Sequence, residues 1–226
     1  MEQAHVLEAL SRVYDPELDE PITALGFVGS CVVSATGDVD VRLRLPTPQC
    51  APNFAYLMVA DARAAVRSLP GVGEVTVALD DHYTAAEINA AVSRDAGFNG
   101  AFPGETDGDL RALRELFQRK ALLARQGRVC TELLARGYRA ETIVALRVAD
   151  LPDGVDARRA VALRRELGLP HDADAPALVA GDGTAIPAEG LRMWHRRAQL
   201  VGTSLESNGG LCRSLLEVRN RTEVCA

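Results

Sequence analysis

Residues 38–45 alternate strictly between apolar and charged side chains, and this pattern constrains the fold more than any other feature of the chain. The two faces are Val39, Val41, Leu43 and Leu45 against Asp38, Asp40, Arg42 and Arg44. Because successive side chains of a strand point to opposite faces, the pattern predicts a strand with one buried face. A strand over 27–34, joined to it at Thr36-Gly37, and a third strand over 75–79 are expected beside it.

Two amphipathic helices are predicted around these strands. Apolar residues recur at helical spacing over 6–13, and Asp15-Pro16 ends that stretch because a residue before proline avoids the helical region. A second apolar stripe covers 54–69 and stops before Pro70-Gly71. The fold class expected is therefore α+β, with helices on one face of a short sheet.

The chain changes character after this unit. Residues 1–92 carry 13 acidic and 5 basic side chains, whereas 93–226 carry 18 and 20, and the stretch 97–108 is rich in glycine. We expect a domain at 1–95, a linker at 96–108 and a mainly helical region at 109–226. That region is predicted to contain a hairpin near 177–186 and separate helices at 188–201 and 210–219.

The basic residues and cysteines exclude several classes of protein. Lys120 is the single lysine among 25 basic residues and follows no glycine, so the chain has no P-loop for phosphate. Five cysteines without a Cys-x-x-Cys pair predict reduced thiols and no closed metal site within one chain. With no signal sequence and no apolar run of about 20 residues, a cytoplasmic protein without a membrane segment is expected.

Cys50 is the leading candidate for chemistry. It lies in Thr47-Pro48-Gln49-Cys50-Ala51-Pro52, and Pro52 suits the first position of the helix that follows. A thiol at a helix N-terminus is stabilised as thiolate, the form that attacks electrophiles or binds metal. A small residue filling a turn explains the position equally well.

The acidic pair in Asp15-Pro16-Glu17 is the second candidate. Two carboxylates that flank a rigid proline can face a metal or a partner. They can also form a solvated turn, which is the commoner case.

Taken in order, these motifs resemble the MIP18 (DUF59) family of iron–sulfur cluster assembly factors. The motifs are Asp15-Pro16-Glu17, Leu25-Gly26-Phe27-Val28, Thr47-Pro48-Gln49-Cys50 and Leu69-Pro70-Gly71-Val72. The resemblance covers about residues 3–92, and it implies a small α+β fold in which Cys50 is the functional thiol. It also implies that Asp15, Glu17 and Thr47 belong to the supporting signature.

The chain departs from the family pattern at three points. Ala51 stands where most members have proline, Asp80-Asp81-His82-Tyr83 replaces an aromatic residue after the third strand, and a long extension follows the domain. The missing P-loop separates the chain from the Mrp-type ATPases that share this domain. The extension is similar to members encoded beside actinobacterial di-iron monooxygenases.

The function expected from this resemblance is that of an accessory factor without turnover. It would assist the maturation of a client metalloenzyme, such as an oxygenase component, or work with the iron–sulfur assembly machinery. The cofactor expected is transient iron or an iron–sulfur cluster. With one strong ligand per chain, a stable site would need a second subunit, help from Asp or Glu, or the client itself, and a homodimer is expected on this ground.

The extension leaves several alternatives open. One interpretation is a docking surface for an acidic client, formed by Arg192-Met193-Trp194-His195-Arg196-Arg197, with His195 and Cys212 as metal contacts. The other is an amphipathic helix with Met193 and Trp194 in the core. Cys225 could join Cys50 at a shared cluster. Residues 128–148 also suggest a DNA-binding helix-turn-helix, although a pI near 5.3 disfavours nucleic acid; a purely structural interaction module is the third alternative.

Overall fold

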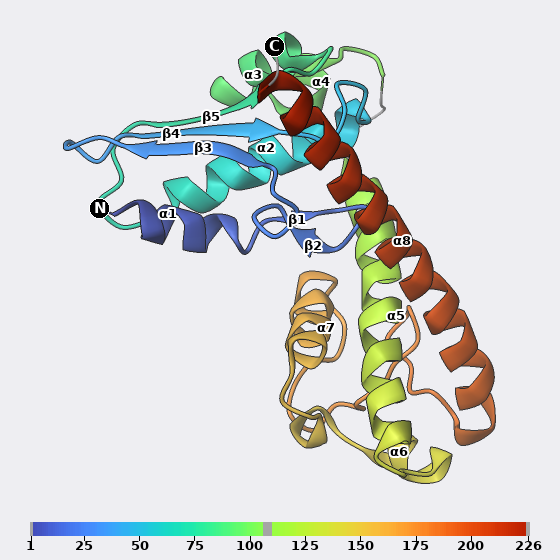
Figure 1. Cartoon of the computed structure of the whole chain (residues 1–226). Coiled ribbons are helices and arrows are strands. Elements are labelled where there is room, and N and C mark those ends of the chain that lie inside the picture. Colours follow the sequence, from blue (N-terminus) through green and yellow to red (C-terminus); the bar gives the residue numbers. More distant parts are fainter. Residues whose placement is uncertain (1, 106–109, 225–226) are drawn as a thin grey trace. The chain divides into compact units, whose positions relative to one another are not determined.

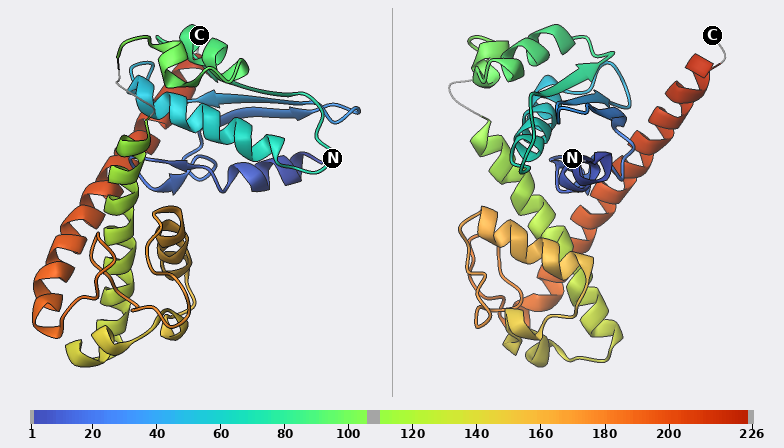
Figure 2. Two further views of the ribbon diagram at one scale, coloured as in Figure 1. Left: turned by 180° about the vertical axis from the view of Figure 1, so that it is seen from behind. Right: turned by 90° about the vertical axis from the view of Figure 1, so that its left-hand side faces the viewer.

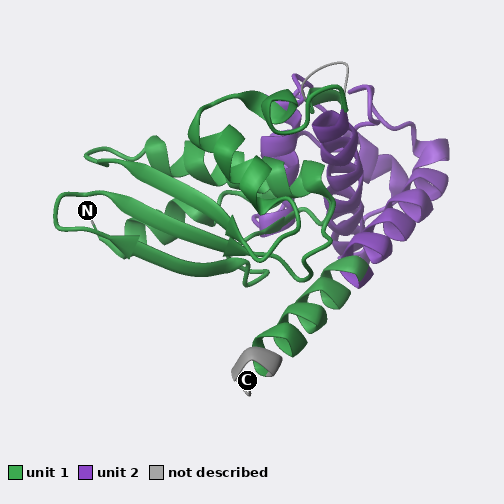
Figure 3. Cartoon of the chain, turned by 90° about the horizontal axis from the view of Figure 1, so that it is seen from above, with its two compact units in different colours: residues 1–112, 208–226 green, residues 113–207 purple. Residues whose placement is uncertain are grey.

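The computed structural model describes residues 2–105 and 110–224, with side chains up to Arg221. Cys225 and part of the expected linker, residues 106–108, lie outside the described residues. The chain forms two compact units, Met1–Ala112 with Asn208–Ala226, and Leu113–Ser207 (Figure 3). We call them unit 1 and unit 2.

Unit 1 is built on a three-stranded sheet of β3 (Val28–Val33), β4 (Val39–Arg44) and β5 (Val75–Asp80), in that order. β4 pairs antiparallel with β3 and parallel with β5. The apolar face of β4 is buried, because Val39, Val41 and Leu43 are at most 2% exposed. The predicted strands and their alternation are therefore confirmed.

Helices complete the α+β fold of unit 1. α1 (Gln3–Leu10) packs against β3 and α2 (Pro52–Arg67) against β5, and the two helices contact each other on one face of the sheet (Figure 1). α3 (Ala85–Ser93) follows β5 and packs on it. A two-stranded ladder of β1 (Tyr14–Asp15) and β2 (Glu20–Pro21) carries the acidic motif. The predicted α+β class is confirmed.

The segment expected to be a linker is partly folded onto unit 1. Residues 97–101 form α4 (Gly97–Ala101), which contacts α3, and Phe98 and Phe102 are buried. The ring of Phe98 meets Tyr56 of α2 edge to face, with centroids 5.5 Å apart. The aromatic residues explain the difference, because burying them outweighs the glycine content of the stretch.

A single helix replaces the two predicted at 188–201 and 210–219. α8 (Leu191–Val224) runs for 34 residues without interruption through Gly209-Gly210 (Figures 1 and 2). Its residues up to Ser207 belong to unit 2, and those from Asn208 belong to unit 1. The compact units therefore differ from the expected division into 1–95 and 109–226.

Unit 2 is mainly helical. Its helices are α5 (Arg111–Ala135), α6 (Ala140–Ala145), α7 (Val155–Glu166), the short 3-10 turns Val148–Asp150 and Ala188–Gly190, and the first part of α8. Gly127 of α5 lies so close to α8 that a Cβ there would be 2.6 Å from the Cβ of Ala198. Near 177–186 a turn closes at Gly183, with one bridge between Val179 and Ala185 rather than two full strands.

A buried arginine connects α7 to this turn region. Arg164 is 1% exposed, and its guanidinium donates to Gln126 Oε1 and to the carbonyl oxygens of Pro176 and Ala177. Burial lowers the pKa of Arg164 to about 10. In the part of the chain that the structure describes, no helix combines the length and the apolar content that a membrane crossing requires.

Candidate functional site

Cys50 lies in the loop between β4 and α2. Pro52 is the first residue of α2, as the sequence predicts, and Ala51 is its N-cap. The half-buried thiol lies 3.7 Å from Thr47 Oγ1, and the Cys50 amide donates to the Thr47 carbonyl at 3.4 Å. Thr47 and Cys50 therefore close one compact turn, in which Cys50 is neither fully buried nor fully exposed.

His82 fixes this loop from the end of β5. The side chain is 8% exposed, and its Nε2 lies 2.7 Å from the Cys50 carbonyl oxygen. Because the Thr84 amide donates to Nδ1 at 3.2 Å, Nδ1 must be the unprotonated nitrogen and Nε2 the donor to Cys50. The next amide, that of Tyr83, donates to the Pro48 carbonyl.

The role of His82 was missed by sequence reasoning. In the sequence, His82 stands only in Asp80-Asp81-His82-Tyr83, where the chain departs from the family pattern. Nothing in a linear sequence signals that its ring meets a backbone carbonyl of a distant loop.

Asp15 is buried beside the turn that follows β1. It is 7% exposed, and its Oδ1 accepts hydrogen bonds from the amides of Glu17, at 2.8 Å, and Leu18, at 3.0 Å. Burial raises the pKa of Asp15 to about 6; the two amide bonds oppose this rise, and the charges of Glu17 and Glu20 add to it. The solvated-turn alternative is therefore wrong for Asp15, whereas Glu17 is half-buried.

The last part of α8 packs across this region of unit 1. Arg213 pairs with Glu20 of β2, and Arg219 donates to the Leu45 carbonyl at 2.7 Å and pairs with Asp81 at 3.4 Å. Between these contacts Leu216 is 4% exposed. Unit 1 thus consists of the N-terminal domain and a helical segment from the far end of the chain, which we call the C-terminal segment (208–221).

This packing brings Cys212 to the candidate site. Cys212 is half-buried, and it interacts electrostatically with Asp15, Cys50 and Glu17. Burial first, and then the negative charge of these three groups, raises the pKa of Cys212 to about 11, although Arg213 opposes the shift. Cys212 thus lies within electrostatic reach of Asp15, Glu17 and Cys50.

His195 is part of unit 2. Its Nε2 lies 2.8 Å from Thr131 Oγ1 of α5, and burial lowers its pKa. Trp194 packs against the core of unit 2, whereas Met193 is 68% exposed. The amphipathic-helix alternative is therefore right for Trp194 and wrong for Met193.

No three or more His, Cys, Asp or Glu side chains within the described residues are grouped so that they could hold a metal ion. Thiolates are the usual ligands of iron–sulfur clusters. Cys50 and Cys212 by themselves are fewer than the four thiolates that such a cluster usually has.

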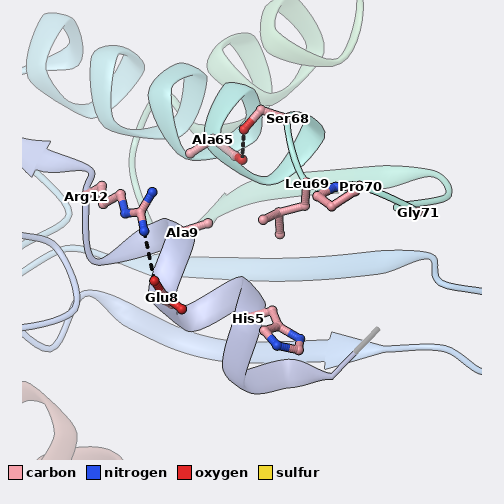
Figure 4. A pocket seen from close by; sticks show the side chains of 9 residues that line it. All are labelled: His5, Glu8, Ala9, Arg12, Ala65, Ser68, Leu69, Pro70 and Gly71. Carbon is pink, nitrogen blue, oxygen red and sulfur yellow. Dashed lines mark hydrogen bonds and ion pairs between the residues drawn. The ribbon is translucent and has the colours of Figure 1, made fainter.

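A pocket of about 460 Å³ lies elsewhere on unit 1, between α1 and the end of α2 (Figure 4). His5, Glu8 and Arg12 line one side, and residues 68–71, which include the start of the Leu69-Pro70-Gly71 motif, line the other. The Arg12 guanidinium is paired with Glu8 at 2.8 Å. The residues that line this pocket include neither Cys50 nor Asp15.

The region proposed as a helix-turn-helix contains a helix, a turn and a helix. α5 ends at Ala135, Gly137 has φ of +87°, and α6 is only six residues long. The side chains of three arginines in this region already pair with carboxylates, namely Arg128, Arg136 and Arg139. These ion pairs reduce the positive charge available for a phosphate backbone.

Comparison with known proteins agrees with the geometry of unit 1. The profile of a family described as "Iron-sulfur cluster assembly protein" matches residues 3–77. An uncharacterized protein from Methanocaldococcus jannaschii is 34% identical over 84 residues, which are 37% of this chain and 86% of the relative. An "Fe-S protein maturation auxiliary factor" from Porphyromonas gingivalis is 34% identical over 74 residues, 33% of this chain and 69% of that protein.

These matches show that the chain belongs to the family of iron–sulfur cluster assembly proteins, as the resemblance to MIP18 (DUF59) proteins predicted. An "Iron-sulfur cluster carrier protein" from Mycobacterium tuberculosis is 39% identical over 77 residues, 34% of this chain. This chain spans only a fifth of the length of that protein.

Proposed function

We propose that the protein is a cytoplasmic accessory factor, without turnover, that handles iron or an iron–sulfur cluster for a client metalloenzyme. Cys50 is the thiolate that contacts the cargo. The observation that carries the proposal is the position of Cys50 within a family match over residues 3–77. Its loop is held in place by His82, and Cys50 is half-buried rather than enclosed in the core.

The client proposed is a metalloenzyme such as a component of a di-iron monooxygenase, as the extension suggests by its resemblance. The assembly machinery supplies the cargo, and a homodimer would double the thiols available to it. Because two facing copies would each contribute Cys50, the dimer would complete a ligand set that one chain lacks. Mass measurement of the native protein with and without bound iron tests this point.

Anaerobic incubation with ferrous iron and sulfide tests the role of Cys50. The wild-type chain should gain the visible absorption of a thiolate-bound cluster, and Cys50→Ser should lose at least nine-tenths of it. Cys31→Ala is the matched control, because that thiol is buried on β3 of the same unit. Equal absorption from wild type and Cys50→Ser would remove Cys50 as the cargo ligand.

A further inference from the structure

We infer that Cys212, carried by the C-terminal segment, is a second thiolate ligand that acts with Cys50 on the same iron or iron–sulfur cargo. The inference rests on the proposed function and deepens it. It concerns a residue beyond the family match, which ends at residue 77. The extension would then complete the site of the family domain.

The face of α8 that packs on unit 1 carries Cys212. Residues 209, 212, 216 and 219 are spaced by three or four and share one face of the helix. Gly209 lies against Glu20, since a Cβ there would be 2.5 Å from Glu20 Oε1. Leu216 Cδ2 lies 3.5 Å from the place that a Cβ of Gly26 would occupy. Cys212 lies between these two contacts.

The same contacts connect the segment to both candidate motifs. Glu20 pairs across the β1–β2 ladder with Asp15, and Arg213 holds Glu20. Arg219 contacts the Leu45 carbonyl and Asp81. Asp81 directly precedes His82, whose ring contacts the Cys50 carbonyl. Cys212 is thus placed between the acidic motif and the cysteine loop by contacts on each side of it.

The packing of Leu216 is the main energetic anchor of the segment. Full burial of a leucine side chain is among the larger contributions that one residue makes to packing. The ion pair of Arg213 and Glu20 is partly exposed, at 41% and 28%, and exposed pairs contribute little. Leu216 therefore does more than the charges to keep Cys212 at the site.

The chemistry of the group suits a soft cation. Asp15, Glu17 and Cys50 act on Cys212 with negative charge, and Arg213, the nearby positive charge, is engaged by Glu20. Thiolates select soft metals and iron–sulfur clusters, and each thiol releases its proton when it binds. Clusters usually have four thiolate ligands, so two from this chain leave positions for a donor, a client or a second copy.

Cobalt(II) provides a direct count of thiolate ligands in the full chain, because its sulfur-to-metal charge-transfer absorption grows with each bound thiolate. We expect Cys50→Ser and Cys212→Ser each to lose about half of this absorption, with at least a tenfold weaker apparent affinity. The double variant should lose all of it. Every protein in this experiment carries Cys225→Ser, so that the thiol of Cys225 does not contribute to the absorption.

Dibromobimane, which becomes fluorescent when it bridges two thiols, tests the juxtaposition without metal. The bridge should form between Cys50 and Cys212 in the parent chain and in Leu215→Ala, whose side chain is 40% exposed. It should fall several-fold in Leu216→Ala, which retains both thiols but loses the anchor. Retention of secondary structure by circular dichroism separates release of the segment from global unfolding.

The two proposals fail in different ways. Full cobalt absorption in Cys212→Ser, or no bridged product from the parent chain, would overturn the role of Cys212 and leave Cys50 in place. Full absorption in Cys50→Ser as well would overturn the proposed function at this site.

Discussion

The burial of Asp15 predicts that Asp15→Asn stabilises the protein at neutral pH. The folded state raises the pKa of this carboxyl from 3.8 to about 6, so folding opposes its ionisation. Between these two pH values the folded protein binds a proton that the unfolded chain releases, so the stability of the wild type falls as pH rises. Asparagine keeps an Oδ1 acceptor for the Glu17 and Leu18 amides but carries no charge.

The size of the effect follows from the shift. One pKa unit corresponds to about 1.4 kcal/mol, so the full cost of ionising Asp15 is about 3 kcal/mol above pH 7. The cost falls to about 1 kcal/mol near pH 4.5, where the unfolded carboxyl is mostly ionised and the folded one is not. Asp15→Asn should therefore gain about 2 kcal/mol more at the higher pH than at the lower.

Urea unfolding at about pH 4.5 and pH 7.5, monitored through hydrogen exchange of the sheet of unit 1, measures this difference. Asp95→Asn is a control of opposite sign: desolvation opposes its ionisation, but Arg63 and Arg67 lower its pKa overall. Compared with the wild type, Asp95→Asn should be less stable by nearly the same amount at both pH values, because the ion pairs contribute in full once the pH exceeds the ordinary carboxyl pKa. If Asp15→Asn proved equally stabilising at both pH values, or destabilising at pH 7.5, the burial argument would be refuted.

Three further predictions concern packing and hydrogen bonds. Gly210→Ala should raise the melting temperature, because it adds about 1 kcal/mol of helix propensity in open space, whereas Gly209→Ala should gain less because its Cβ displaces the Glu20 carboxylate. His82→Phe should lower the free energy of unfolding of unit 1 by about 1–3 kcal/mol in urea, since the carbonyl that Nε2 contacts loses its donor. Arg164→Met should destabilise unit 2 by about 3 kcal/mol, visible as faster hydrogen exchange in α7, because buried carbonyl oxygens lose their donors.

Local patterns predicted the elements of unit 1 well. The alternation in 38–45 requires a strand with one buried face, and Pro52 suits only the start of the helix that follows. These features depend on neighbouring residues, so the sequence contains them directly. The resemblance to a family added the expectation that Cys50 and Asp15 belong to one site.

Long-range contacts could not be predicted in the same way. Separate helices were expected at 188–201 and 210–219, yet α8 is continuous through Gly209, which lies close to the Glu20 carboxylate of a segment far away in the sequence. The proximity of Cys212 to Asp15 depends on this packing. The contact between His82 and the cysteine loop depends on the tertiary fold, and the residues next to His82 in the sequence do not predict it.

The charges of the C-terminal segment bear on how the extension is interpreted. Its arginines suggested a surface for an acidic client, but Arg213 and Arg219 already contact Glu20 and Asp81 of the acidic N-terminal domain. A client carboxylate would have to displace these internal partners before it could bind either arginine. Because the same two side chains flank Cys212 on the packed face of the helix, their displacement would also loosen the second thiol. These two arginines are thus better explained as residues that hold the extension on the family domain than as residues that recognise a client.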